Sequence, residues 1–256
     1  MIRAAALCLL LSAIAAGPAR AEKLTIALST TEVDISATFS GAPLTIFGVI
    51  EPDAGGPPVE DPDYQVAVVV LGPRETVVVR EKDRLLGIWA NRDARVIINP
   101  ASYYSLSVSA PLEYLAPQDT LTRLQLGFDN IAFVYQGGAK VNDQGSADFR
   151  DAFLRLKEEA RLYSDDELVT FIGNTVFRTS AFLPANLPVG SYTAVAYLFS
   201  RGELIARAES PIEVSKTGFE ATMAAFARAQ ALPYGLLCVA LALFVGWLGG
   251  VIFRRD

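Results

Sequence analysis

Apolar and polar residues alternate with a period of two in several short runs of the first 110 positions. The clearest run is 33–39, where every second side chain is apolar, as in a strand with one buried face. Further runs with the length and turn boundaries of strands are 24–29, 44–50, 64–71, 76–80, 85–90, 95–98 and 103–109. Because residues 66–71 are apolar throughout, we expect that strand at the centre of a sheet that is covered on both faces.

The spacing of apolar residues becomes helical after Pro117. A first helix is predicted by Leu121, Leu124, Phe128 and Ile131. A second helix is predicted with Ser146 as its N-cap and Asp148 in its first turn. Its apolar stripe consists of Phe149, Ala152, Phe153, Leu156, Ala160 and Tyr163, and its opposite face is charged.

Strand patterns return at 175–181, 192–199 and 204–208, with 211–214 as a possible last strand. A Pro188-x-Gly190-x-Tyr192 entry and a hairpin turn at 200–203 are typical of the last strands of an immunoglobulin-like sandwich. The sequence therefore predicts a mainly β fold. Residues 22–215 are expected to form an immunoglobulin-like antiparallel β-sandwich with a helical insertion at about 117–170. Two domains divided near Pro117 are the alternative.

Both ends of the chain are apolar. Residues 232–253 carry no charge and are long enough for a transmembrane helix, and residues 216–231 predict a juxtamembrane helix before it. Arg254 and Arg255 follow the span, so the tail 254–256 is expected in the cytoplasm. Residues 1–21 have the basic, apolar and A-x-A regions of a cleaved signal peptide, with an uncleaved signal anchor as the alternative.

Composition narrows the chemistry outside the membrane. The chain has no histidine, and its two cysteines lie in the predicted signal peptide and span, so the exported part has no imidazole or thiol for catalysis or metal binding. The net charge of −6 disfavours nucleic acid as a partner. The acidic segment 51–63 is expected to be a solvated loop, with a calcium site as the alternative. We expect no cofactor and no enzymatic activity.

Two pairs of residues are candidates for interaction. Trp89 either covers a ligand or partner groove, with Asn91 adding polar contacts, or is a core tryptophan of the sandwich. Gly246 and Gly250 lie four residues apart in the span, a spacing that allows a second helix to approach closely. A glycine pair that faces lipid is the alternative for the second pair.

Other residues suggest sites that have simpler explanations. An aromatic cleft is one interpretation of Tyr103, Tyr104, Tyr114 and Tyr135, and tyrosines at a sheet edge are the other. Carboxylates at 148 and 151, and at 165–167, invite comparison with glycosidases, which need two carboxylates across a cleft. We expect both groups to cap helices instead.

The block Gly87-Ile88-Trp89-Ala90-Asn91 and the ending Phe253-Arg254-Arg255-Asp256 resemble a family of uncharacterised alphaproteobacterial transmembrane proteins. The resemblance covers essentially the whole mature chain. It implies a Gram-negative cell envelope, a periplasmic ectodomain and a single span in the inner membrane. It implies no activity. Family members are often encoded near permeases of the sulfite-exporter type, which suggests a partner.

Two functions are therefore weighed. The leading hypothesis is a membrane-anchored periplasmic accessory or interaction protein that lies in the lipid bilayer and docks on a permease, or on a second copy of itself, through its span. The competing hypothesis is an ectodomain that binds, or less plausibly hydrolyses, a periplasmic solute or glycan.

Overall fold

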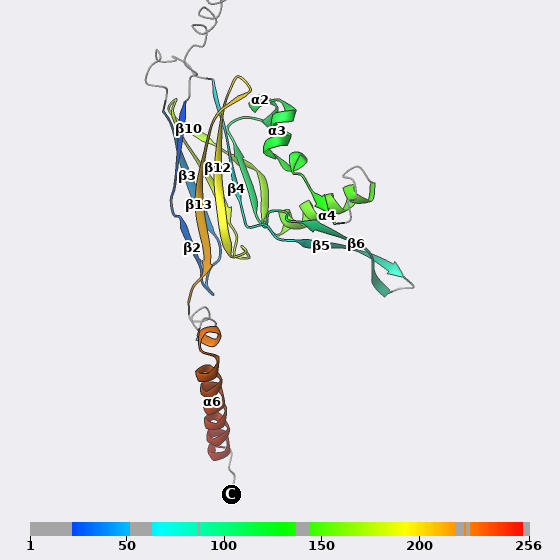
Figure 1. Ribbon diagram of the computed structural model, residues 1–256, viewed down its shortest axis with the longest axis vertical. Helices are drawn as coiled ribbons and strands as arrows, with labels where there is room; N and C mark the ends of the chain where they lie inside the picture. Colours follow the sequence, from blue (N-terminus) through cyan, green and yellow to red (C-terminus); the bar gives the residue numbers. More distant parts are fainter. Residues whose placement is uncertain are drawn as a thin grey trace, which may run out of the picture.

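The computed structural model describes residues 22–51, 63–85, 88–136, 144–218, 223 and 226–252 (Figure 1). It is mainly β, as predicted, with several antiparallel sheets and one C-terminal apolar helix. The segments predicted as signal peptide and cytoplasmic tail, and most of the acidic segment, residues 52–62, fall outside the described residues.

One sheet of the sandwich has four strands, all antiparallel. Their order across the sheet is β1 (Lys23–Leu28), β3 (Ala42–Glu51), β11 (Val176–Leu183) and β10 (Thr170–Ile172). The strand predicted at 33–39 is shorter in the structure, where β2 ends at Ile35. β2 belongs to the other sheet.

The second sheet has six strands. Their order is β2 (Glu32–Ile35), β13 (Glu203–Lys216), β12 (Gly190–Ser200), β4 (Tyr64–Leu71), β7 (Tyr104–Val108) and β9 (Tyr163–Leu168). β4 is interior and almost completely buried, as its continuous apolar run predicted. The two edge strands, β2 and β9, pair in parallel with their neighbours, so this sheet is not purely antiparallel.

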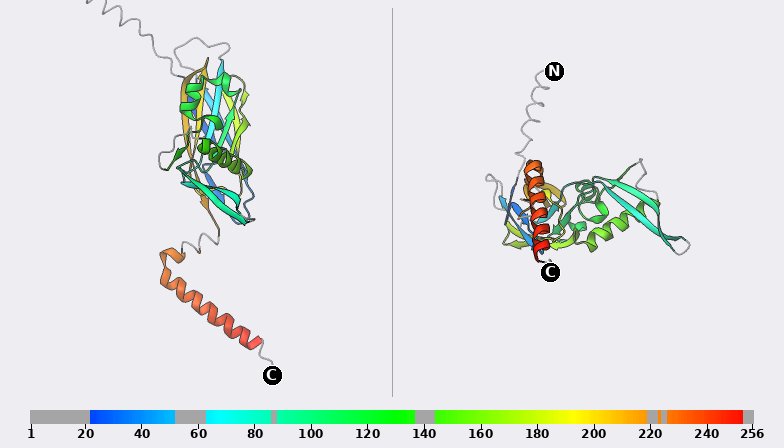
Figure 2. Two further views of the ribbon diagram at one scale, coloured as in Figure 1. Left: turned by 90° about the vertical axis from the view of Figure 1, so that its right-hand side faces the viewer. Right: turned by 90° about the horizontal axis from the view of Figure 1, so that it is seen from below.

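A third, smaller sheet projects from the sandwich (Figures 1 and 2). It consists of β5 (Val77–Leu85), β6 (Ile88–Ile98) and β8 (Val134–Tyr135), and the helix α4 (Gln144–Glu159) lies along it. We call β5, β6, β8 and α4 the arm. The prediction of three short strands at 76–80, 85–90 and 95–98 is wrong in extent, because two longer strands replace them. Their pairing continues through the charged residues after Arg80, with a register shift between Glu81 and Lys82.

The helices between β7 and β9 also differ from the prediction. The first helix does not reach Ile131: α2 (Leu112–Leu115) and α3 (Gln118–Leu124) are short, and Gln125 ends α3 in the left-handed conformation with φ 55°. A 3₁₀ turn, η1 (Phe128–Asn130), follows.

The predicted start of the second helix is wrong. α4 begins at Gln144, so Ser146 lies inside the helix and Asp148 lies beyond its first turn. The apolar stripe is correct at Phe149 and Phe153, but Leu156 is 54% exposed.

The last two strands form the predicted hairpin. Arg201 and Gly202 at its turn both have positive φ, which suits the twist of a two-residue hairpin loop. At the other end of β12, the Tyr192 hydroxyl donates a hydrogen bond of 2.5 Å to the Pro188 carbonyl, the contact of a tyrosine corner. The immunoglobulin-like assignment beyond this contact stays a prediction.

β13 is a single strand, not the two predicted at 204–208 and 211–214. Pro211 lies within it, opposite Thr193. β13 extends to Lys216, which corrects the predicted start of the juxtamembrane helix; residues 226–229 are helical.

The predicted span is confirmed as a helix, α6 (Ala231–Ile252), in every described position. Pro233 lies in its first turn, where backbone amides have no acceptor within the helix. The amide hydrogen that proline lacks therefore costs no helical hydrogen bond. The most apolar 18-residue window within Ala231–Gly250 has a mean hydropathy of 2.1, and none of that window is buried against the rest of the protein. α6 is thus long and apolar enough to cross a membrane.

Gly48 of β3 leaves room for a large side chain on the neighbouring strand of the same sheet. Gly48 lies opposite Phe177 of β11, whose ring is fully buried, and a Cβ at Gly48 would overlap that ring. We expect Gly48→Ala to lower the free energy of unfolding by about 1–3 kcal/mol, because the buried ring has to move. Thermal melting of the purified protein measures this loss.

The double variant Gly48→Ala, Phe177→Leu tests the cause. It is expected to lose less stability than the sum of the two single variants, since the smaller side chain removes the overlap. Strictly additive losses contradict this account.

Candidate functional site

A cluster of buried residues lies at the base of the arm and is continuous with the core of the sandwich, because the Phe153 ring packs against Tyr163 of β9 at a centroid distance of 5.7 Å. The buried residues that form the cluster are Val79, Ile97, Phe133, Tyr135, Phe149 and Phe153. The Tyr135 hydroxyl donates to the Ser146 carbonyl at 2.9 Å, and the Arg95 guanidinium lies 5.5 Å from the Phe149 ring centroid. Helix α4 is therefore fixed to the hairpin at its base.

Lys157 of α4 joins the arm to the sandwich. Its side chain is only 12% exposed, and its ammonium group donates to the Ser102 carbonyl at 3.1 Å and to the Glu75 carboxylate at 3.2 Å. The same group lies 5.6 Å from the Phe153 ring centroid and 5.9 Å from that of Tyr163. Charge, hydrogen bonds and aromatic faces thus meet at one ammonium group.

Arg150 joins α4 to the segment after α3. Its guanidinium donates to the Phe128 carbonyl at 2.7 Å and lies 5.8 Å from the Phe133 ring centroid. Asp129 and Asp151 are within ion-pair distance, at 3.8 and 3.6 Å. The sequence pattern placed Arg150 and Lys157 on the outer, charged face of the helix. The two residues are seven apart, so they share one face near the apolar stripe, and this spacing is the signal in the sequence that they could reach the sandwich.

A groove of about 460 Å³ runs between the hairpin and α4. Its lining residues are Val79, Arg80, Glu81, Asp93, Asp148, Phe149, Ala152 and Arg155. Three carboxylates and two guanidiniums around a small apolar floor suit a charged protein surface better than a small apolar ligand. Asp148 faces this groove whereas Asp151 pairs with Arg150, so the two do not form a joint carboxylate pair.

The second group of carboxylates does not cap a helix, which corrects the prediction. Asp165, Asp166 and Glu167 lie in strand β9. The Asp165 carboxylate accepts a hydrogen bond of 3.3 Å from the Phe128 amide. Burial raises the pKa of Asp165 above its usual value of 3.8, and the hydrogen bond from Phe128 only partly opposes the shift.

The four tyrosines do not share a cleft. Tyr103, Tyr104 and Tyr135 are buried, and their hydroxyls donate to backbone carbonyls of Phe182, Gln125 and Ser146. Tyr114 is 70% exposed. Burial raises the pKa of Tyr103 and Tyr104, so both phenols stay protonated. The sheet-edge interpretation is also wrong for Tyr104, which lies in the interior strand β7.

Trp89 and Asn91 lie in the outer part of the β5–β6 hairpin. Their backbones pair with Arg84 and Lys82 respectively, which places Trp89 on the arm and not in the sandwich. Their side chains are outside the described residues, so a role in partner contact stays a prediction.

Gly246 and Gly250 lie in α6, where a Cβ added to either would meet no protein atom within 4 Å. The described part of this chain therefore offers neither glycine a packing partner. Bilayer lipid or another helix is left to cover them, and both alternatives stay open.

Within the described residues, a mainly β fold is joined to one apolar helix of span length, which is the arrangement of a membrane-anchored protein. Residues 23–255 match the family described as "Putative transmembrane protein (Alph_Pro_TM)", and the chain belongs to this family. Comparison with curated proteins and with solved structures gave no match.

The contacts of Lys157 predict that the arm loosens when the ammonium group is removed. We expect Lys157→Met to lower the free energy of unfolding by about 1–3 kcal/mol, because the variant loses its charge-assisted hydrogen bonds. Amide hydrogen exchange in α4 should also accelerate. The exposed Arg155 is a matched control, and Arg155→Met should change stability by less than about 0.5 kcal/mol. Equal effects of the two substitutions argue against this attachment.

Asp165 predicts a pH-dependent difference between variants. Because its folded-state pKa is raised, its contribution to stability is complete below the ordinary value of 3.8 and is lost as the pH rises through the folded-state pKa. Asparagine keeps an acceptor for the Phe128 amide without the charge. Asp165→Asn should therefore melt at a higher temperature than the native protein at pH 7, by a margin that shrinks toward pH 4. A margin independent of pH contradicts this origin.

Proposed function

We propose that this protein is a membrane-anchored accessory protein of the cell envelope that contacts a partner protein and catalyses no reaction. The observation that carries the proposal is the arm, which extends from the sandwich beyond what the fold needs (Figure 1). Its base packs onto the core of the sandwich and is attached through Lys157, whereas the groove between the hairpin and α4 is open and charged. A projecting element with a charged groove suits recognition of a partner surface that carries complementary charge.

The proposed orientation follows from charge and from the signal peptide. Arg254 and Arg255 favour a cytoplasmic C-terminus, which leaves the sandwich and the arm on the opposite side of the inner membrane, in the periplasm. The absence of histidine from the chain supports the non-enzymatic assignment, because the most common general base is missing.

The proposed partner is a membrane permease, of the sulfite-exporter type that the family resemblance suggests. Gly246 and Gly250 support contact within the bilayer, since a helix partner can approach the backbone closely at both. Self-association through the same glycines is the alternative arrangement.

A second candidate function is binding of a periplasmic solute or glycan, with hydrolysis as a less favoured variant. Its support is the same groove, in which Glu81, Asp93 and Asp148 present carboxylates beside two arginines. Such groups bind sugar hydroxyls, but the exposed aromatic platform that usually accompanies them is absent among the described lining residues.

Co-purification from the native membrane tests the leading proposal. Full-length tagged protein is extracted in mild detergent, and associated proteins are identified for the native chain and for the double variant Gly246→Leu, Gly250→Leu. Ala240→Leu adds apolar bulk roughly 100° away around the helix from the two glycines and is the positional control. We expect one membrane protein to accompany the native chain and the control, and at least a tenfold loss from the double variant.

Each outcome bears on a different part of the proposal. A partner that survives the glycine substitutions but is lost with Trp89→Ala would place the contact on the arm. Recovery of tagged and untagged copies together, without another protein, would favour self-association. If no protein accompanies the native chain, the accessory function loses its support and ligand binding becomes the better explanation.

A further inference from the structure

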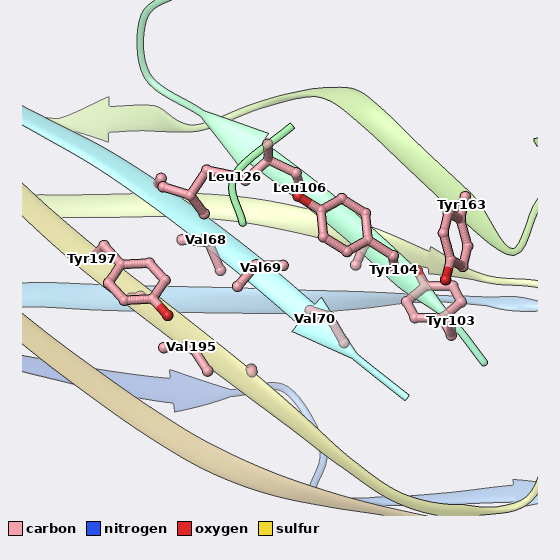
Figure 3. Packing of buried hydrophobic residues seen from close by; sticks show 14 of the residues in the cluster. Val68, Val69, Val70, Tyr103, Tyr104, Leu106, Leu126, Tyr163, Val195 and Tyr197 are labelled. Atoms are coloured by element: carbon pink, nitrogen blue, oxygen red, sulfur yellow. The ribbon is translucent and has the colours of Figure 1, made fainter. Parts of the chain in front are cut away.

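A cavity of about 280 Å³ lies on the face of the six-stranded sheet that α3 and the following segment cover. Its floor combines Val69 of β4 with three tyrosines from neighbouring strands, Tyr104, Tyr163 and Tyr197. Figure 3 shows these side chains along the sheet. All four are less than 8% exposed, so the floor is apolar and aromatic, and packing holds it in place.

Two of the three tyrosine hydroxyls in the floor donate hydrogen bonds to backbone carbonyls. Tyr104 donates to the Gln125 carbonyl at 3.0 Å and Tyr163 to the Ala101 carbonyl at 2.6 Å. The Tyr197 hydroxyl makes no hydrogen bond to another described residue, and Tyr197 lines the cavity; burial raises its pKa, so the phenol stays protonated. One phenol therefore remains free to donate to a ligand.

The rim of the cavity is positively charged. Arg74, Arg123 and Arg207 line it, and none of the described lining residues is acidic. Arg74 donates to the Asn99 carbonyl at 3.2 Å, and Arg207 pairs with Glu209 at 2.9 Å. Arg123, in the last turn of α3, makes no hydrogen bond or ion pair with the described part of the chain.

Glu209 offsets the charge of Arg207, which leaves Arg74 and Arg123 as rim cations without an ion pair among the described residues. An anion between them would lower their mutual repulsion. A guanidinium also presents paired donors that match a carboxylate or sulfonate. The aromatic floor adds a surface for an apolar group. The volume is slightly below the usual range of ligand sites, which excludes an oligosaccharide.

We propose that this cavity binds a small amphipathic anion, with a planar apolar body on the tyrosine floor and one carboxylate or sulfonate at the arginine rim. Arg123 supplies the principal contact to the anionic group, and the Tyr197 hydroxyl donates a second hydrogen bond. This site is separate from the arm groove and from the span, and it does not depend on the accessory function.

Calorimetric titration of the full-length protein in nanodiscs of zwitterionic lipid, with empty nanodiscs subtracted, tests the proposal. The probes are phenylacetate and benzenesulfonate. Inorganic sulfate has the charge without the body, and benzyl alcohol has the body without the charge. We expect both aromatic anions to bind at least tenfold more tightly than sulfate or the alcohol, because each of these lacks half of the contact.

Variants assign the contact. Arg123→Gln should weaken phenylacetate binding about tenfold and Tyr197→Phe several-fold, each with a melting temperature close to that of the native protein. Arg155→Gln, an exposed arginine on α4 outside this cavity, should bind as the native protein does. The proposal is overturned if neither aromatic anion binds, if sulfate binds as tightly as phenylacetate, or if a folded Arg123→Gln protein retains native affinity. Loss of co-purifying partners leaves these titrations unchanged, so the two proposals fail separately.

Discussion

A strand that is apolar on both faces must be covered on both faces, and β4 imposes this requirement on the rest of the structure. Its residues Val66 to Val70 are at most 2% exposed. The four-stranded sheet covers one face, and α2, α3 and the segment after them cover the other. The helices between β7 and β9 are therefore a structural layer without which the six-stranded sheet would expose its central strand.

Tyrosine hydroxyls hold this layer in register without a disulfide. Tyr104 both donates to the Gln125 carbonyl and accepts from the Gly127 amide, so one phenol satisfies two backbone groups of the segment that follows α3. Tyr103, Tyr163 and Tyr192 make similar bonds to carbonyls elsewhere. Burial raises the pKa of Tyr192 to about 12, so its bond persists across the physiological range. Leaving a buried phenol unpaired costs more free energy than a formed hydrogen bond contributes. Folding therefore favours the arrangement in which each of these hydroxyls reaches its backbone partner.

Sequence patterns predicted the features that depend on neighbouring residues. A continuous apolar run predicted the burial of β4, glycine placement predicted the turn at Arg201 and Gly202, and length and hydropathy predicted the helix α6. Features that depend on distant pairing did not follow. No local signal indicates that β2 and β9 pair in parallel, because the partners are far apart in the chain.

The candidate sites show the same division between local and distant information. The glycines of the span were identifiable, since four-residue spacing is a local property of a helix. The cavity arginines were not, because Arg74, Arg123 and Arg207 come from three separate segments and meet only after folding. Lys157 was misjudged for a related reason. Its aliphatic stem and charged group reach across to the sandwich, whereas helical periodicity assigns each residue a single face.

The last strand before the anchor has a mechanical consequence. β13 is 14 residues long, pairs with β12 along most of its length, and at its C-terminal end also pairs in parallel with β2. A pull transmitted from the bilayer through α6 would act along this strand and load its ladder of hydrogen bonds simultaneously. The β12–β13 ladder would then resist tension in shear, with its hydrogen bonds sharing the load.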